Sequence, residues 1–214
     1  MTGSKEAEYW NKAATTFEAD QEWIAKSLIQ IGIQKLIQEH NLGEVVEFGC
    51  GTGLCTKPLA QNAKHIVATD ISDEMIKIAR TRLEGFQNIT VEKADCKNTS
   101  FSSGRFDTVF MGNLIHVIEN PQKALQESWR ILRNDGTLLI ISGTSYGMRP
   151  FEKIKMFIRA IRLIRKWGIP PRYVRGNYSP DELSSLVESA GFKIEKVELI
   201  GDRMKALYLR ARKR

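Results

Sequence analysis

The sequence predicts a doubly wound α/β fold, in which strands alternate with helices that cover both faces of one sheet. Three observations lead to this prediction. Five short apolar runs alternate with helical stretches, a glycine-rich turn follows the first run, and two further strand-like runs close the chain. Repeated alternation of strand and helix indicates parallel pairing through right-handed crossovers. The length of 214 residues fits one domain with a small insertion.

The elements are predicted in order along the chain. An amphipathic helical pattern comes first, with Ile24, Leu28 and Ile31 at helical spacing before Gly43 interrupts it. The five apolar runs predict strands at 45–48, 66–69, 89–92, 106–111 and 137–142. Helices are predicted at 56–62, 73–83 and 121–132.

Capping residues mark two helix starts in the second half of the chain. Asn120 with Pro121 predicts an N-cap, and Ser179 with Glu182 predicts a reciprocal capping box. Gly191 is placed to end the last helix. The runs 192–199 and 205–211 then predict an antiparallel pair of strands.

Composition restricts the class of protein. Apolar residues make up 42% of the chain and charged residues 27%, which is typical of a globular domain with a real core. No apolar run approaches the roughly 18 residues of a membrane span, and the polar N-terminus does not look like a secretory signal. Three cysteines, without metal-ligand spacing, argue against disulfides and a metal site. We therefore expect a cytoplasmic protein.

The net charge of +7 is concentrated in one segment. Residues 151–178 contain eight Lys/Arg and a single acid, Glu152, so the rest of the chain is formally neutral. A basic segment fits nucleic acid, an anionic membrane or an acidic ligand, and by itself does not choose between them.

The glycine-rich turn after the first strand has a diagnostic spacing. Gly49, Gly51 and Gly53 form G-x-G-x-G, whereas a dinucleotide fingerprint is G-x-G-x-x-G and a phosphate loop ends in Gly-Lys-Ser/Thr. Glu47, two residues before the first glycine, would repel a pyrophosphate but could accept a hydrogen bond from an ammonium group. The turn therefore favours a ligand that bears an ammonium.

Acidic residues end the next two strands. Asp70 lies twenty-one residues after Gly49, where an acid can take both ribose hydroxyls. Ile71 and Met75 are suited to pack on an adenine, and Asp95 could accept a hydrogen bond from its amino group. The carboxyl ends of parallel strands lie at one edge of a sheet, so we expect a single ligand site there.

At this point the sequence resembles the class I S-adenosylmethionine-dependent methyltransferases, and looks closest to the branch that makes ubiquinone and menaquinone. The matching segments are VVEFGCGTG (45–53), ATDISDEM (68–75), KADC (93–96), 105–125, 132–142 and 177–198. The resemblance implies a Rossmann-like seven-stranded sheet of order 3-2-1-4-5-7-6 with the seventh strand antiparallel. It also implies N-terminal helices and a helical insertion after the fifth strand.

The resemblance also implies a cofactor, S-adenosylmethionine, with S-adenosylhomocysteine as product, and a role for each matching residue. The implied contacts are Glu47, Gly49 and Gly51 to the methionine part, Asp70 to the ribose, Ile71 and Met75 to the adenine, Asp95 and Cys96 to its edge, Asn113 near the methionine end, Cys50 as a small lining residue, and Tyr9, with Trp10, as a lid.

His116 is the candidate catalytic residue. Methyl transfer is an in-line displacement that needs mainly positioning, and a base only when the acceptor must lose a proton. The related sequences often have two adjacent histidines here, whereas Val117 follows His116 in this chain. The alternative is a structural histidine at a strand end.

A basic helix is predicted over 151–167, inside an insertion at 144–178. Its basic stripe consists of Lys155, Arg159, Arg162 and Lys166. The side predicted to face the core consists of Ile154, Phe157, Ile158, Ile161 and Ile164. Three interpretations stay open: a solvated face over a core helix, a lid over the acceptor pocket, and peripheral contact with an anionic membrane.

Taken together, the sequence predicts one methyltransferase domain over 1–214, with a helical cap at 1–40 and the basic insertion at 144–178. It would transfer a methyl group to a small-molecule or lipid-like acceptor. The alternatives are a non-catalytic module that binds the cofactor and a nucleotide-dependent oxidoreductase, which the glycine spacing and the absence of a Tyr-x-x-x-Lys pair disfavour. Nucleic acid is not a favoured partner, and the acceptor atom and oligomeric state stay open.

Overall fold

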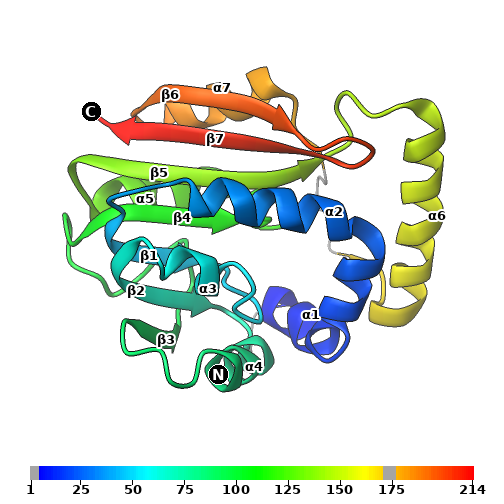
Figure 1. Cartoon of the computed structure of the whole chain (residues 1–214), viewed down its shortest axis with the longest axis horizontal. Helices are drawn as coiled ribbons and strands as arrows, with labels where there is room; N and C mark the ends of the chain where they lie inside the picture. The colour runs from blue at the N-terminus through cyan, green and yellow to red at the C-terminus, as the bar shows by residue number, and fades with distance from the viewer. Residues whose placement is uncertain (1–4, 171–176) are drawn as a thin grey trace.

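The computed structural model describes residues 5–170 and 177–214, with the backbone alone for 18 and 21–28, so the side chains of Ile24 and Leu28 lie outside it. The predicted fold is confirmed: one seven-stranded sheet has the order β3-β2-β1-β4-β5-β7-β6 (Figure 1). The strands are β1 (Gly43–Phe48), β2 (Ala63–Asp70), β3 (Ile89–Lys93), β4 (Phe106–Gly112), β5 (Leu132–Thr144), β6 (Phe192–Ile200) and β7 (Lys205–Lys213). The helices are α1 (Lys5–Ala14), α2 (Phe17–Ile37), α3 (Thr56–Leu59), α4 (Asp73–Arg82), α5 (Pro121–Ile131), α6 (Pro150–Trp167) and α7 (Pro180–Ser189).

The sheet is mixed in the predicted way. Strands β1 to β5 pair in parallel, and β7 runs antiparallel to both β5 and β6. Strand β1 lies between β2 and β4, and its last four residues are buried. Because the first five strands are parallel, their carboxyl ends meet at one edge of the sheet, beside α1 and the start of α2 (Figure 1).

Two apolar layers, one on each face of the sheet, form the core. One layer joins Phe48 and Leu138 to Leu125 of α5 and Leu183 of α7. The other joins strand residues to buried side chains of α2, α3 and α4, which include Leu36, Leu59 and Ile76. Helices thus cover both faces, as expected for strands that are buried on both sides.

Helix ends follow the capping residues. The Asn120 side chain accepts from the backbone N–H of Lys123, and Ser179 and Glu182 form both bonds of the capping box. Helix α3, predicted over 56–62, ends at Leu59, because the chain turns at Asn62 and β2 begins at Ala63. The opening helical pattern is divided into α1 and α2 at Thr15 and Thr16.

One burial prediction is wrong. The side of α6 expected to face the core points to solvent, with Ile154, Phe157 and Ile158 58–67% exposed. The helix lies at the edge of the molecule beyond the carboxyl ends of the strands, against α1 and α2 (Figure 1). Its periodicity identified residues that share a side, but the core does not lie on that side. Across the described residues, no helix is both long and apolar enough to span a bilayer.

The different burial of two apolar residues gives a stability test. Leu138→Ala in β5 should lower the free energy of unfolding by about 2–5 kcal/mol, because it leaves a cavity in a fully buried layer. Phe157→Ala should change it by no more than about 0.5 kcal/mol, because that ring is already solvent-exposed. Urea denaturation measures both. A large loss for Phe157→Ala would mean that α6 packs against the core after all.

Candidate cofactor site

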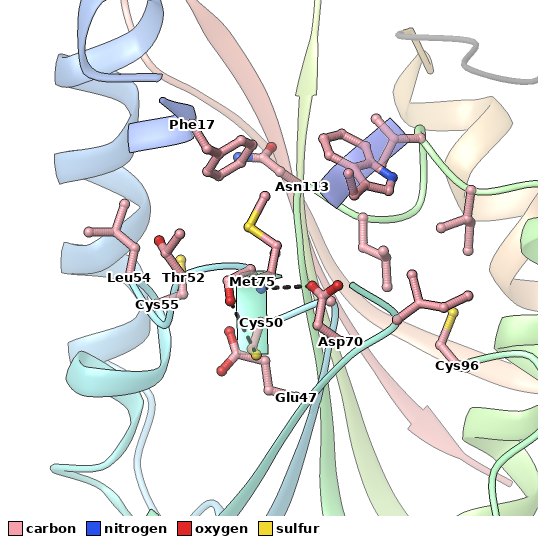
Figure 2. Close-up of a pocket in the computed structure, with 18 of the residues that line it drawn as sticks. Phe17, Glu47, Cys50, Thr52, Leu54, Cys55, Asp70, Met75, Cys96 and Asn113 are labelled. Carbon is pink, nitrogen blue, oxygen red and sulfur yellow. Dashed lines mark hydrogen bonds between the residues drawn. The ribbon is translucent and has the colours of Figure 1, made fainter. Parts of the chain in front are cut away.

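A pocket opens at the carboxyl edge of the parallel strands (Figure 2). It lies between the ends of β1 to β4 and the helices α1 and α2. Ten of the residues predicted to bind the cofactor line it: Glu47, Gly49, Cys50, Gly51, Asp70, Ile71, Met75, Asp95, Cys96 and Asn113. The structure therefore gathers them around one cavity, and their binding of a cofactor stays a prediction.

The glycine turn brings backbone close to the pocket. Gly49 has a φ of +67°, and a Cβ there would lie 2.6 Å from Cδ1 of Leu114. Gly51 has a φ of +54°, and its backbone N–H donates to Oδ2 of Asp70 over 2.9 Å. Residues with a side chain rarely adopt this left-handed conformation, and at Gly49 no space is left for one. The turn thus needs glycine for its shape and links β1 to the end of β2.

Asp70 is a buried carboxylate held by backbone groups. Its Oδ1 accepts from the N–H of Ser72 over 2.9 Å, while Oδ2 accepts from Gly51. Burial raises the pKa of Asp70, and these backbone donors partly oppose that rise. Each carboxylate oxygen has a second lone pair, so both can accept another hydrogen bond.

Glu47 is the second buried carboxyl group of the pocket. Oγ1 of Thr56 donates to its Oε2 over 2.5 Å. Burial raises the pKa of Glu47 to about 7, and the negative charge of Asp70 also raises it. No ion pair among the described residues includes Glu47 or Asp70. Two buried acids without a cationic protein partner fit a ligand that carries positive charge and hydroxyl donors.

An ion pair closes the pocket at the end of β3. Nζ of Lys97 lies 2.6 Å from Oε2 of Glu6 in α1 and 3.8 Å from Oδ1 of Asp95. Both Lys97 and Glu6 line the pocket, and sequence reasoning missed both. The pair joins residues 91 positions apart, and no local pattern reports such a contact.

Burial keeps the thiols of the pocket protonated at neutral pH. Burial raises the pKa values of Cys50 and Cys96 and, to about 12, that of Cys55. A thiol protonated at neutral pH is a poor nucleophile, so these side chains act as small lining groups. Within the described ranges, no group of His, Cys, Asp or Glu is arranged to hold a metal ion.

Aromatic residues from α1 and α2 cover the pocket. Trp10 and Phe17 line it, whereas Tyr9 does not and instead packs edge-on against Trp10, with ring centroids 5.1 Å apart. Oδ1 of Asn11 accepts from Oγ of Ser72 over 2.6 Å, which ties α1 to the start of α4. Of the two predicted lid residues, Trp10 reaches the cavity, and Tyr9 packs against Trp10.

His116 lies outside the set of residues that line the pocket. Its Nδ1 is 2.9 Å from Oγ of Ser142, and burial lowers its pKa to about 4. An imidazole with that pKa is uncharged at neutral pH and a weak base. The contact with Ser142 matches the structural alternative, and a catalytic role for His116 stays a prediction.

Comparisons with known proteins agree with this geometry. A family profile described as "Methyltransferase domain" matches residues 46–140, from β1 to β5. The demethylmenaquinone methyltransferase of Tropheryma whipplei (strain Twist) is 28% identical over 70% of this chain, and the match covers 66% of that protein, just under two thirds. A ubiquinone/menaquinone biosynthesis C-methyltransferase of Citrifermentans bemidjiense is 25% identical over 81% of this chain and 74% of its own length.

The fold has close structural neighbours. A crystal structure from Thermotoga maritima, described as a possible histamine N-methyltransferase, has a TM-score of 0.73 at 20% identity. The similarity covers 98% of this chain and 100% of that one. The profile spans the glycine turn and the ends of β2 to β4, which line much of the pocket. These comparisons support a class I S-adenosylmethionine-dependent methyltransferase: residues 46–140 match the domain profile, and the sequence is similar to ubiquinone and menaquinone methyltransferases.

Proposed function

We propose that the protein binds S-adenosylmethionine in this pocket and transfers its methyl group to a small-molecule or lipid-like acceptor that is largely apolar. The observation that carries the proposal is the pair of buried carboxyl groups, Glu47 and Asp70, beside a glycine turn in one cavity. A cation with a ribose and an ammonium group complements that pair, whereas a pyrophosphate would be repelled by it.

The residues present fit this cofactor. Asp70 would accept from the ribose hydroxyls, because both its oxygens keep acceptor capacity while backbone donors fix their direction. Glu47 would accept from the ammonium of the methionine part. Met75 and Ile71 offer apolar surface for the adenine. When bound, the cofactor supplies a methyl group on a positively charged sulfur, which is already activated for displacement.

The part of the pocket lining that we take as the acceptor end is apolar. Phe17, Ile29, Gly32, Ile141 and Ala206 line it from α2, β5 and β7. Among the described residues that line the pocket, the charged ones belong to α1 and to β1–β3 or the turns after these strands, and none lies at this end. Here the chain would contribute position and exclusion of water, which suffice for an in-line transfer between aligned atoms. The names of the two quinone-pathway relatives support an acceptor of this character.

The similarity to methyltransferases argues against the oxidoreductase alternative. A module that binds the cofactor without catalysis stays as one outcome of the tests below. In the proposed methyltransferase, the helical cap at 1–40 and the insertion at 144–178 would close the pocket over the acceptor. Trp10 and Phe17, which line the pocket, support that role for the cap.

The ribose site can be tested at Asp70. Asp70→Asn should weaken binding of S-adenosylhomocysteine by at least about tenfold, because it replaces a buried acceptor of charge-assisted hydrogen bonds. Calorimetric titration of the purified protein measures this. The matched control is Asp73→Asn, which changes an exposed carboxylate paired with Lys93 and should leave the affinity unchanged. Unchanged affinity in Asp70→Asn would sink the assignment.

Titration of Glu47 gives a pH test. With a pKa of about 7, this carboxyl group is mostly protonated at pH 6 and mostly ionised at pH 8. Only the ionised form attracts an ammonium group, so affinity for S-adenosylhomocysteine should fall about tenfold from pH 8 to pH 6. Glu47→Gln should remove that slope. Calorimetry at pH 6, 7 and 8 decides, and an equal slope in both proteins would contradict the role.

The acceptor end can be blocked separately. A Cβ at Gly32 would meet only Ile141, at 3.8 Å, so Gly32→Leu should fold while it fills the apolar end. Affinity for S-adenosylhomocysteine should stay within about twofold, and methyl transfer to a panel of apolar quinols and amines should be lost. Transfer of labelled methyl groups reports the second quantity. Equal transfer by both proteins would place the acceptor elsewhere, and no transfer by either would favour the non-catalytic module.

A further inference from the structure

The outward side of α6 is a continuous apolar surface. Phe151, Ile154, Phe157 and Ile158 are 58–67% exposed, and Ile161 and Ile164 are 37–39% exposed. Their spacing of three and four residues places them on one side of the helix. Ile169, just after the helix, is 84% exposed. Single exposed apolar residues are ordinary, but a contiguous surface of this kind marks an interaction site.

Basic residues accompany this surface. Lys153, Arg162 and Arg165 are exposed on or beside the apolar side. The acid of the helix, Glu152, lies within 3.5 Å of Nζ of Lys155. Because the segment 151–178 carries the whole net charge of +7, the positive potential of the protein is concentrated here. Aliphatic side chains flanked by Lys and Arg are the composition of helices that lie in a membrane interface.

The opposite side of α6 is fixed to the lid of the pocket. Trp167 is buried, its Nε1 donates to Oγ1 of Thr16 over 3.1 Å, and its ring stacks on Phe17 with centroids 6.1 Å apart. Nζ of Lys166 pairs with Asp20 over 2.7 Å. These contacts hold α6 with its apolar side outward, while its opposite side packs against Phe17, which lines the cofactor pocket.

We propose that the outward side of α6 binds the surface of an anionic lipid bilayer. The apolar side chains would enter the boundary between headgroups and acyl chains while the basic ones reach the lipid phosphates. A second copy fits less well, since a two-fold contact through this surface would oppose Arg165 and Lys153 to like charges. Single-stranded nucleic acid fits less well too, because most of the apolar residues are aliphatic and offer no base-stacking surface.

The test is binding to vesicles, and it does not depend on methyl transfer. The full chain should co-sediment with vesicles of phosphatidylglycerol and phosphatidylcholine, and at least about tenfold less with phosphatidylcholine alone. Phe157→Glu/Ile158→Glu should lower the partition coefficient on the mixed vesicles at least about tenfold. Lys153→Glu/Arg165→Glu should remove the preference for the anionic lipid.

Matched controls separate this surface from net charge and from folding. Lys77→Glu/Lys193→Glu makes the same charge change at exposed positions on α4 and β6, and it should keep most of the binding. All variants should keep wild-type circular dichroism and affinity for S-adenosylhomocysteine. The proposal is overturned if the wild type binds no vesicles or if the control loses as much binding as Lys153→Glu/Arg165→Glu. It is also overturned if the wild type is a dimer by light scattering that Phe157→Glu/Ile158→Glu converts to monomer, which would assign the surface to a second copy.

Discussion

A carboxylate removed from water is costly unless hydrogen bonds or opposite charge compensate it, and this site is built around two of them. Asp70 is held by backbone N–H groups of Gly51 and Ser72, and Glu47 by the hydroxyl of Thr56. These neutral donors fix the direction of both groups without neutralising their charge. The glycine turn follows from this constraint, because its backbone must come within hydrogen-bond distance of Asp70. A cationic ligand would complete the compensation, so the architecture favours one kind of cofactor.

The positions of α1 and α6 over the pocket depend instead on side-chain contacts between segments far apart in the sequence. Lys97 with Glu6 and Asn11 with Ser72 hold α1 over the strand ends. Trp167 and Lys166 hold α6 against the junction of α1 and α2. The pocket is therefore closed by residues from segments far apart in the chain, and α6 packs on that closure through the side opposite its apolar surface. If α6 rests on a lipid surface, an apolar acceptor would have a short route from the bilayer to the pocket.

Helix α6 shows which structural features a periodic apolar pattern can predict. The spacing of its apolar residues identified correctly which of them share a side. It could not tell whether that side meets the core, because burial depends on what the rest of the chain has already covered. In the sheet, the inference from apolar runs to burial was correct, because β1 and β4 have strands on both sides and helices on both faces.

The sequence by itself determined the strands, the capped helix starts, the glycine turn and the acids at the strand ends. All of these rest on local patterns: apolar periodicity, capping chemistry and a spacing that only one class of turn satisfies. The sheet order came from the family resemblance rather than from the residues alone. Tertiary structure decided that Trp10 and Phe17 reach the cavity while Tyr9 does not, that Glu6 pairs with Lys97, and that the apolar side of α6 faces outward. These features depend on contacts between distant segments, whose energies are set only when the chain has packed.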